Sequence, residues 1–275
     1  MATEAEGPRR APTVRDFLEM KAQGRPIVAL TAYDVLFARL LEEAGVDLIL
    51  VGDSLGQVVL GHPSTLPVTL DDMIRHAAAV RRGAPDSFLV ADMPFLTYQV
   101  SVEETVRNAG RIMKEAGVQA VKLEGGGRRA LEAVETLVAV GIPVMGHLGL
   151  TPQSVHAIGG YRVQGREETS AQRLREQARD LEAAGAFSIV LELVPGDLAG
   201  EISRSLTVPT IGIGAGPQCD GQVLVLYDAL GLNEGFQPRF LKRFAELHAA
   251  ALDGVEGYVR EVRDGTYPGP EHTFA

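Results

Sequence analysis

Short apolar runs alternate with amphipathic segments along most of the chain. The runs are rich in Val, Ile and Leu at successive positions, which is typical of strands buried on both faces of a parallel sheet. The segments between them repeat apolar residues at helical spacing, and most are followed by glycine, the usual residue after the last turn of a helix. The pattern predicts eight strands, at 27–33, 47–52, 88–92, 120–124, 142–147, 187–192, 208–214 and 223–226.

The helical segments between these strands favour a barrel. They lie at 35–44, 70–82, 102–116, 128–140 and 171–184, with an extra helix at 13–23 before the first strand. Eight strands alternating with helices within about 250 residues are typical of a closed (β/α)₈ TIM barrel in the α/β class. An open doubly wound sheet is less favoured, because the first strand is followed by TAYDVLF and not by a glycine-rich turn. The extra helix is predicted to plug the bottom of the barrel.

The composition indicates one catalytic domain. It does not shift between about residues 25 and 260, so we expect a single barrel over 12–264. Residues 1–11 are predicted to be a flexible tail, and the Gly/Pro-rich residues 265–275 a second tail. Of the 275 residues 45 % are hydrophobic, which excludes disorder for the bulk of the chain, and no apolar run is long enough for a membrane span.

Charge and cysteine content narrow the expected partners. The formal net charge is −10, and an acidic protein repels a phosphate backbone, so neither nucleic acid nor a membrane is an expected partner. The single cysteine, Cys219, cannot form an internal disulfide, which predicts a reducing, cytoplasmic location.

Five consecutive predicted strands carry ionisable groups at their carboxyl ends, where barrel enzymes place their active sites. A lone carboxylate there is more simply a helix cap or a rim salt bridge, and a lone histidine a hydrogen-bonded rim residue. Several carboxylates together are different, because burying them is unfavourable without a cation. The polar residues at these strand ends are Asp53, Ser54, Asp92, Lys122, Glu124, His147 and Glu192.

These residue types indicate a hard metal ion. Carboxylate oxygens suit Mg²⁺ or Mn²⁺, whereas no Cys/His pair has the spacing of a zinc site. An open Mg²⁺ site can chelate a 2-oxo acid through its carboxylate and keto oxygens and act as a Lewis acid toward an enolate. Lys122 would balance the anionic substrate, or it is a structural partner for Glu124. The sequence neighbours of Glu192 are apolar, a surround that suits a general base.

Several segments, in order along nearly the whole chain, resemble the ketopantoate (3-methyl-2-oxobutanoate) hydroxymethyltransferase family. The blocks at 51–73 and 146–166 are the most specific. The resemblance implies a TIM barrel of the phosphoenolpyruvate/pyruvate-binding type and a large homo-oligomer, often a decamer. The matching segments are LTAYD (30–34), VGDSLGQVVLGHPSTLPVTLDDM (51–73), ADMPF (91–95), VKLEGG (121–126), GHLGLTPQSVHAIGGYRVQGR (146–166), LELVP (191–195) and IGIGAGPQCDGQVLV (211–225).

The resemblance also implies an activity and a site. The activity is transfer of a hydroxymethyl group from 5,10-methylenetetrahydrofolate to 3-methyl-2-oxobutanoate through a Mg²⁺-stabilised enolate, with one Mg²⁺ per subunit. The product is 2-dehydropantoate, in the first committed step of pantothenate biosynthesis. Matched residue by residue, the metal ligands are Asp53, Asp92 and Glu124, the substrate contacts are Asp53, Ser54, Asp92, Lys122 and His147, and the proton acceptor is Glu192. The family often has a cysteine where this chain has Leu193.

Two other functions remain open at this point. One is a metal-dependent lyase of the same barrel superfamily, which makes or breaks a C–C bond beside a 2-oxo acid without folate. The other is a non-catalytic barrel that binds a metabolite. Within the first function, His147 is the alternative base, with Glu192 as its hydrogen-bond partner.

Overall fold

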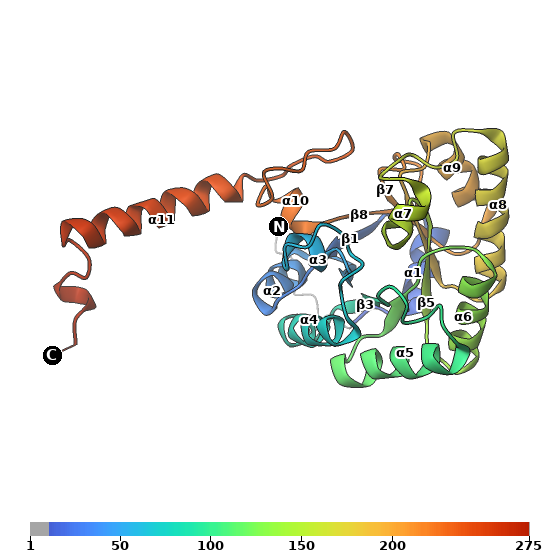
Figure 1. Ribbon diagram of the computed structural model, residues 1–275, viewed down its shortest axis with the longest axis horizontal. Helices are drawn as coiled ribbons and strands as arrows, with labels where there is room; N and C mark the ends of the chain where they lie inside the picture. The colour runs from blue at the N-terminus through green and yellow to red at the C-terminus, as the bar shows by residue number, and fades with distance from the viewer. Residues whose placement is uncertain (1–10, 275) are drawn as a thin grey trace, which may run out of the picture. The chain divides into compact units, whose positions relative to one another are not determined.

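The computed structural model, which describes residues 11–274, contains the predicted barrel. Eight parallel strands pair in chain order, and the last strand closes onto the first (Figure 1). All eight lie where the apolar runs predict them, with ends shifted by a few residues. The strands are β1 (Ile27–Thr31), β2 (Leu48–Val51), β3 (Phe88–Asp92), β4 (Ala120–Lys122), β5 (Val144–Gly149), β6 (Ser188–Glu192), β7 (Thr210–Ile213) and β8 (Gly221–Leu224).

Helices follow most of the strands along the chain, and the five predicted between strands are all present. The sequence did not predict α9 and α11, which both contain internal glycines that lower helix propensity. The longer helices are α1 (Val14–Ala22), α2 (Val35–Ala44), α4 (Leu70–Gly83), α5 (Val102–Ala116), α6 (Arg128–Ala139), α8 (Glu168–Ala183), α9 (Gly196–Ser205) and α11 (Leu247–Asp264). Short turns of helix are α3 (Leu55–Val58), η1 (Pro152–Ser154), α7 (Val155–Ile158), α10 (Leu226–Ala229) and η2 (Pro270–His272).

Local side chains determine where several of these helices begin and end. Thr69 caps α4 by accepting a hydrogen bond from the backbone N–H of Asp72, whose carboxylate accepts one in return from the Thr69 backbone. Helix α2 ends at Gly45, which adopts the left-handed conformation that glycine tolerates best. Gly83 differs from this pattern: it is the last residue of α4, and Ala84 is the residue that caps the helix.

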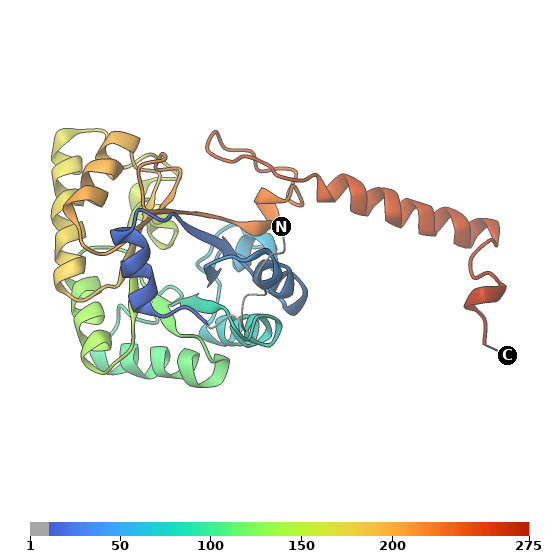
Figure 2. The ribbon, with the colours of Figure 1, turned by 180° about the vertical axis from the view of Figure 1, so that it is seen from behind.

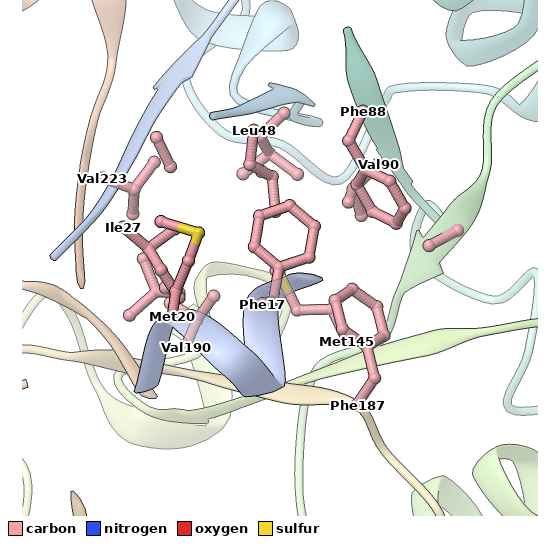
Figure 3. Close-up of a cluster of buried hydrophobic side chains, with 14 residues drawn as sticks. Phe17, Met20, Ile27, Leu48, Phe88, Val90, Met145, Phe187, Val190 and Val223 are labelled. Atoms are coloured by element: carbon pink, nitrogen blue, oxygen red, sulfur yellow. The ribbon is translucent and has the colours of Figure 1, made fainter. Parts of the chain in front are cut away.

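Helix α1 fills the bottom of the barrel, as the sequence predicts. Its buried side chains, Phe17 and Met20, pack against the residues that begin β1, β2 and β3, namely Ile27, Leu48 and Phe88 (Figure 3). The Phe17 and Phe88 rings meet edge to face, with centroids 4.9 Å apart. Figure 2 shows α1 on the side of the barrel turned away in Figure 1. Because the amino ends of the strands are plugged with apolar side chains, polar chemistry is left to their carboxyl ends.

The chain divides into two units at the end of the barrel. The first runs to Val225 and contains all eight strands, and the second begins at Leu226 and contains α10, α11 and η2. The predicted domain over 12–264 spans the whole barrel and part of the second unit, and its bounds stay a prediction. The predicted tail 1–11 lies, apart from Ala11, outside the described residues. Within residues 11–274, none of the helices combines the length and apolar character needed to cross a bilayer.

Gly83 is required by packing between helices. A Cβ atom added to it would lie 2.4 Å from the carbonyl oxygen of Val35 and 2.8 Å from the Ala38 Cβ. We therefore expect Gly83→Ala to lower the free energy of unfolding by about 1–3 kcal/mol, as overpacking does. Gly110, inside α5, is the matched control, because its added Cβ would meet nothing within 4 Å. Gly110→Ala should stabilise by about 0.5–1 kcal/mol, and urea denaturation of both variants measures this. Equal effects of the two substitutions would show that Gly83 is not a packing requirement.

Candidate active site

The residues singled out from the sequence come together at the carboxyl ends of the strands. Asp92, Lys122 and Glu192 are the last residues of β3, β4 and β6. Asp53 and Glu124 follow β2 and β4 by two residues, and His147 lies within β5. All are buried except Glu192, whose side chain is 17 % exposed, and the half-buried Ser54.

Lys122 lies at the centre of the cluster. Its Nζ atom is 2.9 Å from Asp92 Oδ1, 4.0 Å from Glu124 Oε1 and 3.3 Å from His147 Nδ1. Burial alone would lower the pKa of Lys122, but the charges of the carboxylates around it outweigh burial and hold that pKa above its ordinary value. The buried side chain is therefore a permanent ammonium ion, and its closest carboxylate is that of Asp92 and not of Glu124.

His147 bridges two carboxylates. Its Nδ1 lies 3.6 Å from Glu124 Oε1, and its Nε2 lies 3.2 Å from Glu192 Oε2. Burial and the neighbouring Lys122 charge lower the pKa of His147, yet its close contacts with the carboxylates of Glu124 and Glu192 outweigh them and raise it to about 9. The same contact with His147, together with Lys122, outweighs burial and lowers the pKa of Glu124. The ring is therefore an imidazolium in this arrangement.

The apolar neighbours of Glu192 in the sequence do not surround its carboxylate. Side chains alternate between the two faces of a strand, so Leu191 points away from the face that carries Glu192. Leu193 lies beyond the end of β6 and has a left-handed backbone, with φ +47°. The carboxylate instead faces the His147 ring at 3.2 Å and is partly open to solvent. The carboxylate thus lies between a polar ring and solvent on this side, and its role as general base stays a prediction.

Asp53 is the carboxylate of the cluster whose ionised form is disfavoured by its surroundings. Burial, and then the charges of Asp92 and Glu124, raise the pKa of Asp53 well above its ordinary value. Its backbone N–H donates to Asp92 Oδ2 at 3.0 Å, which ties the two strand ends together. When all groups are ionised, the carboxylates of Asp53, Asp92, Glu124 and Glu192 exceed Lys122 and His147 by two negative charges.

Comparison with known proteins agrees with this chemistry. The family model described as ketopantoate hydroxymethyltransferase matches residues 11–270. A 3-methyl-2-oxobutanoate hydroxymethyltransferase of Pelobacter propionicus is 56 % identical over 97 % of this chain and 98 % of its own length. Another, of Syntrophus aciditrophicus, is 54 % identical over the full length of both chains.

The chain belongs to the ketopantoate hydroxymethyltransferase family. It is therefore an enzyme, a hydroxymethyltransferase with a TIM-like barrel. The barrel itself is similar to that of a solved 2,3-dimethylmalate lyase of the PEP mutase/isocitrate lyase superfamily, with a TM-score of 0.58 at 18 % identity over 94 % of this chain and 92 % of the other. This likeness supports the fold that the sequence predicts.

The donor chemistry of the hydroxymethyltransferase site fits a divalent cation. Within residues 11–274, no group of three His, Cys, Asp or Glu side chains is arranged to hold a metal ion directly. However, Asp92 Oδ1 is buried and has no hydrogen-bond partner in that part of the chain beyond its ion pair with Lys122. Such an orphaned oxygen, in a cluster with two surplus negative charges, suits Mg²⁺ held by one or two carboxylates with water and substrate.

The sequence patterns did not single out three polar residues of the site. The Tyr33 hydroxyl lies 2.8 Å from Ser54 Oγ, and Tyr98 and Gln153 hydrogen-bond to the cluster around Glu124. Neutral side chains in loops give no charge signal at a strand end. Gln153 lies within the specific block 146–166, so the resemblance alone could have indicated it.

The raised pKa of His147 predicts a pH dependence of stability. The folded protein binds this proton more tightly than the unfolded chain, so the stabilisation is complete below about pH 6.5 and is lost as the pH rises through about 9. With divalent metal removed by EDTA, the melting temperature should fall as the pH rises across that range, because the free energy of unfolding decreases by up to about 3 kcal/mol. His147→Gln should flatten the decline. An undiminished decline in that variant would contradict the assignment.

Proposed function

We propose that this enzyme transfers a hydroxymethyl group from 5,10-methylenetetrahydrofolate to C3 of 3-methyl-2-oxobutanoate, giving 2-dehydropantoate for pantothenate synthesis. The observation that carries the proposal is the cluster of two buried cations among four carboxylates at the open end of the barrel. The names of the full-length relatives support the substrates.

The buried cations recognise the acidic substrate. Lys122 and His147 are both held in the charged state, so they attract the carboxylate and the keto oxygen of a 2-oxo acid. The hydroxyl of Ser54, next to Asp53, adds a neutral donor. Asp53 and Asp92, with Glu124 beside them, would hold Mg²⁺. When bound, that ion supplies Lewis-acid polarisation of the 2-oxo acid.

Glu192 removes the C3 proton in this proposal. Its carboxylate is the most exposed of the cluster, so it is the one that a substrate can reach, and His147 holds it from one side at 3.2 Å. Water adds to the methylene carbon of the folate and both of its C–N bonds break, so tetrahydrofolate leaves with one proton on each nitrogen and the one-carbon unit remains as formaldehyde. The C3 carbanion equivalent then adds to that carbon: a C–C bond forms, the C=O π bond breaks, and the new oxygen takes up the proton that Glu192 removed.

A product assay with 3-methyl-2-oxobutanoate, 5,10-methylenetetrahydrofolate and Mg²⁺, each omitted in turn, tests this function. We expect 2-dehydropantoate only with all three. Cleavage or formation of a C–C bond without the folate would favour the lyase. Absence of any turnover would favour a non-catalytic barrel.

The role of Glu192 predicts a partial reaction. Without the folate, the enzyme with Mg²⁺ should exchange the C3 proton of 3-methyl-2-oxobutanoate for deuterium from solvent. Glu192→Gln keeps the shape and removes the basic oxygen, so the exchange rate should fall by about 10²–10⁴-fold. Normal exchange in Glu192→Gln, together with abolished exchange in His147→Gln, would transfer the role to the histidine.

We further infer a cytoplasmic homo-oligomer, for which the family resemblance suggests a decamer. The single cysteine, Cys219, is free, which suits a reducing compartment. Helix α11 supports assembly. None of its residues is buried, and it carries large apolar side chains at helical spacing, Leu252, Val255, Val259 and Val262. The barrel unit also exposes Val28 and Leu36, with 50 % and 66 % of their surface accessible.

Substitution on α11 tests the assembly. We expect the wild type to sediment at micromolar concentration as a species several times its chain mass of 29.4 kDa. The double variant Val255→Asp, Val259→Asp should sediment as smaller species, because charges on an apolar interface oppose burial. The matched control, Glu256→Asp, keeps the charge on the same helix and should leave the mass unchanged. A single 29.4 kDa species for the wild type would contradict the proposal.

A further inference from the structure

Gln153 joins several segments of the active site through an uncharged side chain. It lies in η1, just after β5, and is only 5 % exposed. Its side-chain Nε2 donates to Asp53 Oδ2 at 2.9 Å and to the carbonyl oxygen of Met93 at 3.0 Å. Its backbone N–H donates to Glu124 Oε2 at 3.0 Å. One residue therefore contacts segments that follow β2, β3 and β4.

The local sequence explains how the backbone contact arises. The first N–H groups of a helical turn have no partner within that turn and are free to bind an anion. In η1 the first residue is Pro152, which has no N–H, so the N–H of Gln153 is the first donor available. It points at the Glu124 carboxylate, which comes from the neighbouring strand of the barrel.

The orientation of the Gln153 amide is determined on both sides. Two oxygens, one of Asp53 and one of Met93, accept hydrogen bonds from its nitrogen. On the other side the Tyr98 hydroxyl donates to Gln153 Oε1 at 2.9 Å. A flipped amide would place its oxygen against a carboxylate and a carbonyl, so this arrangement is the only one that satisfies all of these groups.

The contacts hold one oxygen of each carboxylate and leave the other. Gln153 binds Asp53 Oδ2 and leaves Asp53 Oδ1 uncontacted by its amide. Glu124 Oε2 is bound by the Gln153 backbone, and Glu124 Oε1 faces Lys122 and His147. A carboxylate held by one oxygen presents the other in a defined direction. Partners of this kind orient metal-binding side chains.

We propose that Gln153 is a positioning residue for the divalent cation of this site, which holds Asp53 with one oxygen directed at the cation. This inference rests on the proposed function, because it concerns the same Mg²⁺. The side-chain amide of Gln153 is occupied by Asp53, Met93 and Tyr98. It acts through Asp53, and its backbone acts through Glu124.

The test compares two glutamines of the same barrel. Gln153→Met keeps the length of the side chain and removes both the donor nitrogen and the acceptor oxygen of the amide. Gln119→Met is the matched control, because Gln119 is also an amide that joins segments: its Oε1 accepts from Arg81 and from the Leu89 backbone, and it contacts none of the carboxylates of the site. Gln153→Asn, a milder change that keeps the amide but withdraws it from Asp53, serves if the methionine variant does not fold.

The primary measurement is the rise in melting temperature during a Mg²⁺ titration without substrates. The Mg²⁺ concentration at which half of this rise is reached, the Mg²⁺ midpoint, should increase by about 10–100-fold in Gln153→Met. It should change in the same direction in Gln153→Asn. Gln119→Met should lower the melting temperature and leave the Mg²⁺ midpoint at its wild-type value. In turnover, Gln153→Met should need more Mg²⁺ for half-maximal rate but approach the wild-type kcat at saturating Mg²⁺.

The outcomes separate this inference from the function on which it rests. An unchanged Mg²⁺ midpoint in both Gln153 variants overturns the positioning role, even if the wild type makes 2-dehydropantoate. An equal change in the Gln119→Met midpoint also overturns it, because general loosening of the barrel would then explain the effect. A selective change with no hydroxymethyl transfer by the wild type supports the positioning role and contradicts the proposed function.

Discussion

Mutual repulsion among buried carboxylates is the constraint on which this active site depends. Asp53, Asp92 and Glu124 are each almost fully buried at one end of the barrel, and Glu192 lies at their edge. Lys122 and His147 offset only part of this charge, and the strain is concentrated on Asp53, whose pKa burial and its neighbours raise. A cluster of buried carboxylates does not stabilise the fold. It is explained by a site that binds a cation and an anionic substrate, because the two ligands together complete the charge balance.

The barrel makes this arrangement feasible by separating its two ends. Apolar residues that begin the strands pack on Phe17 and Met20 of α1, so the hydrophobic stabilisation is concentrated away from the carboxylates. At the other end the parallel strands deliver polar side chains from consecutive positions in the barrel to one place. Neutral groups, above all the Gln153 amide and the Tyr98 hydroxyl, then hold the charged ones in position.

Much of the fold and the charged part of the site follow from sequence patterns. Doubly buried strands, helix caps such as Thr69 and ionisable residues at strand ends are all local signals. Contacts between distant segments leave no such local signal in the sequence. The need for glycine at Gly83 arises from a helix 48 residues earlier in the chain, which begins at Val35. Gln153 has no charge and no periodicity to mark it, and the contact of Glu192 with His147 joins two different strands of the barrel. The composition does not change at Val225, where the first of the two units ends.

The most direct measurement is an anomalous-scattering crystal structure of the enzyme with Mn²⁺ and 3-methyl-2-oxobutanoate. The excess of carboxylates over cations in the cluster predicts one Mn²⁺ per chain at the carboxyl ends of β2 and β3, coordinated by carboxylate oxygens of Asp53 or Asp92, with the 2-oxo acid beside Lys122. A substrate complex whose Mn²⁺ lies elsewhere, or whose carboxylate cluster holds no Mn²⁺ at saturating concentration, would contradict it.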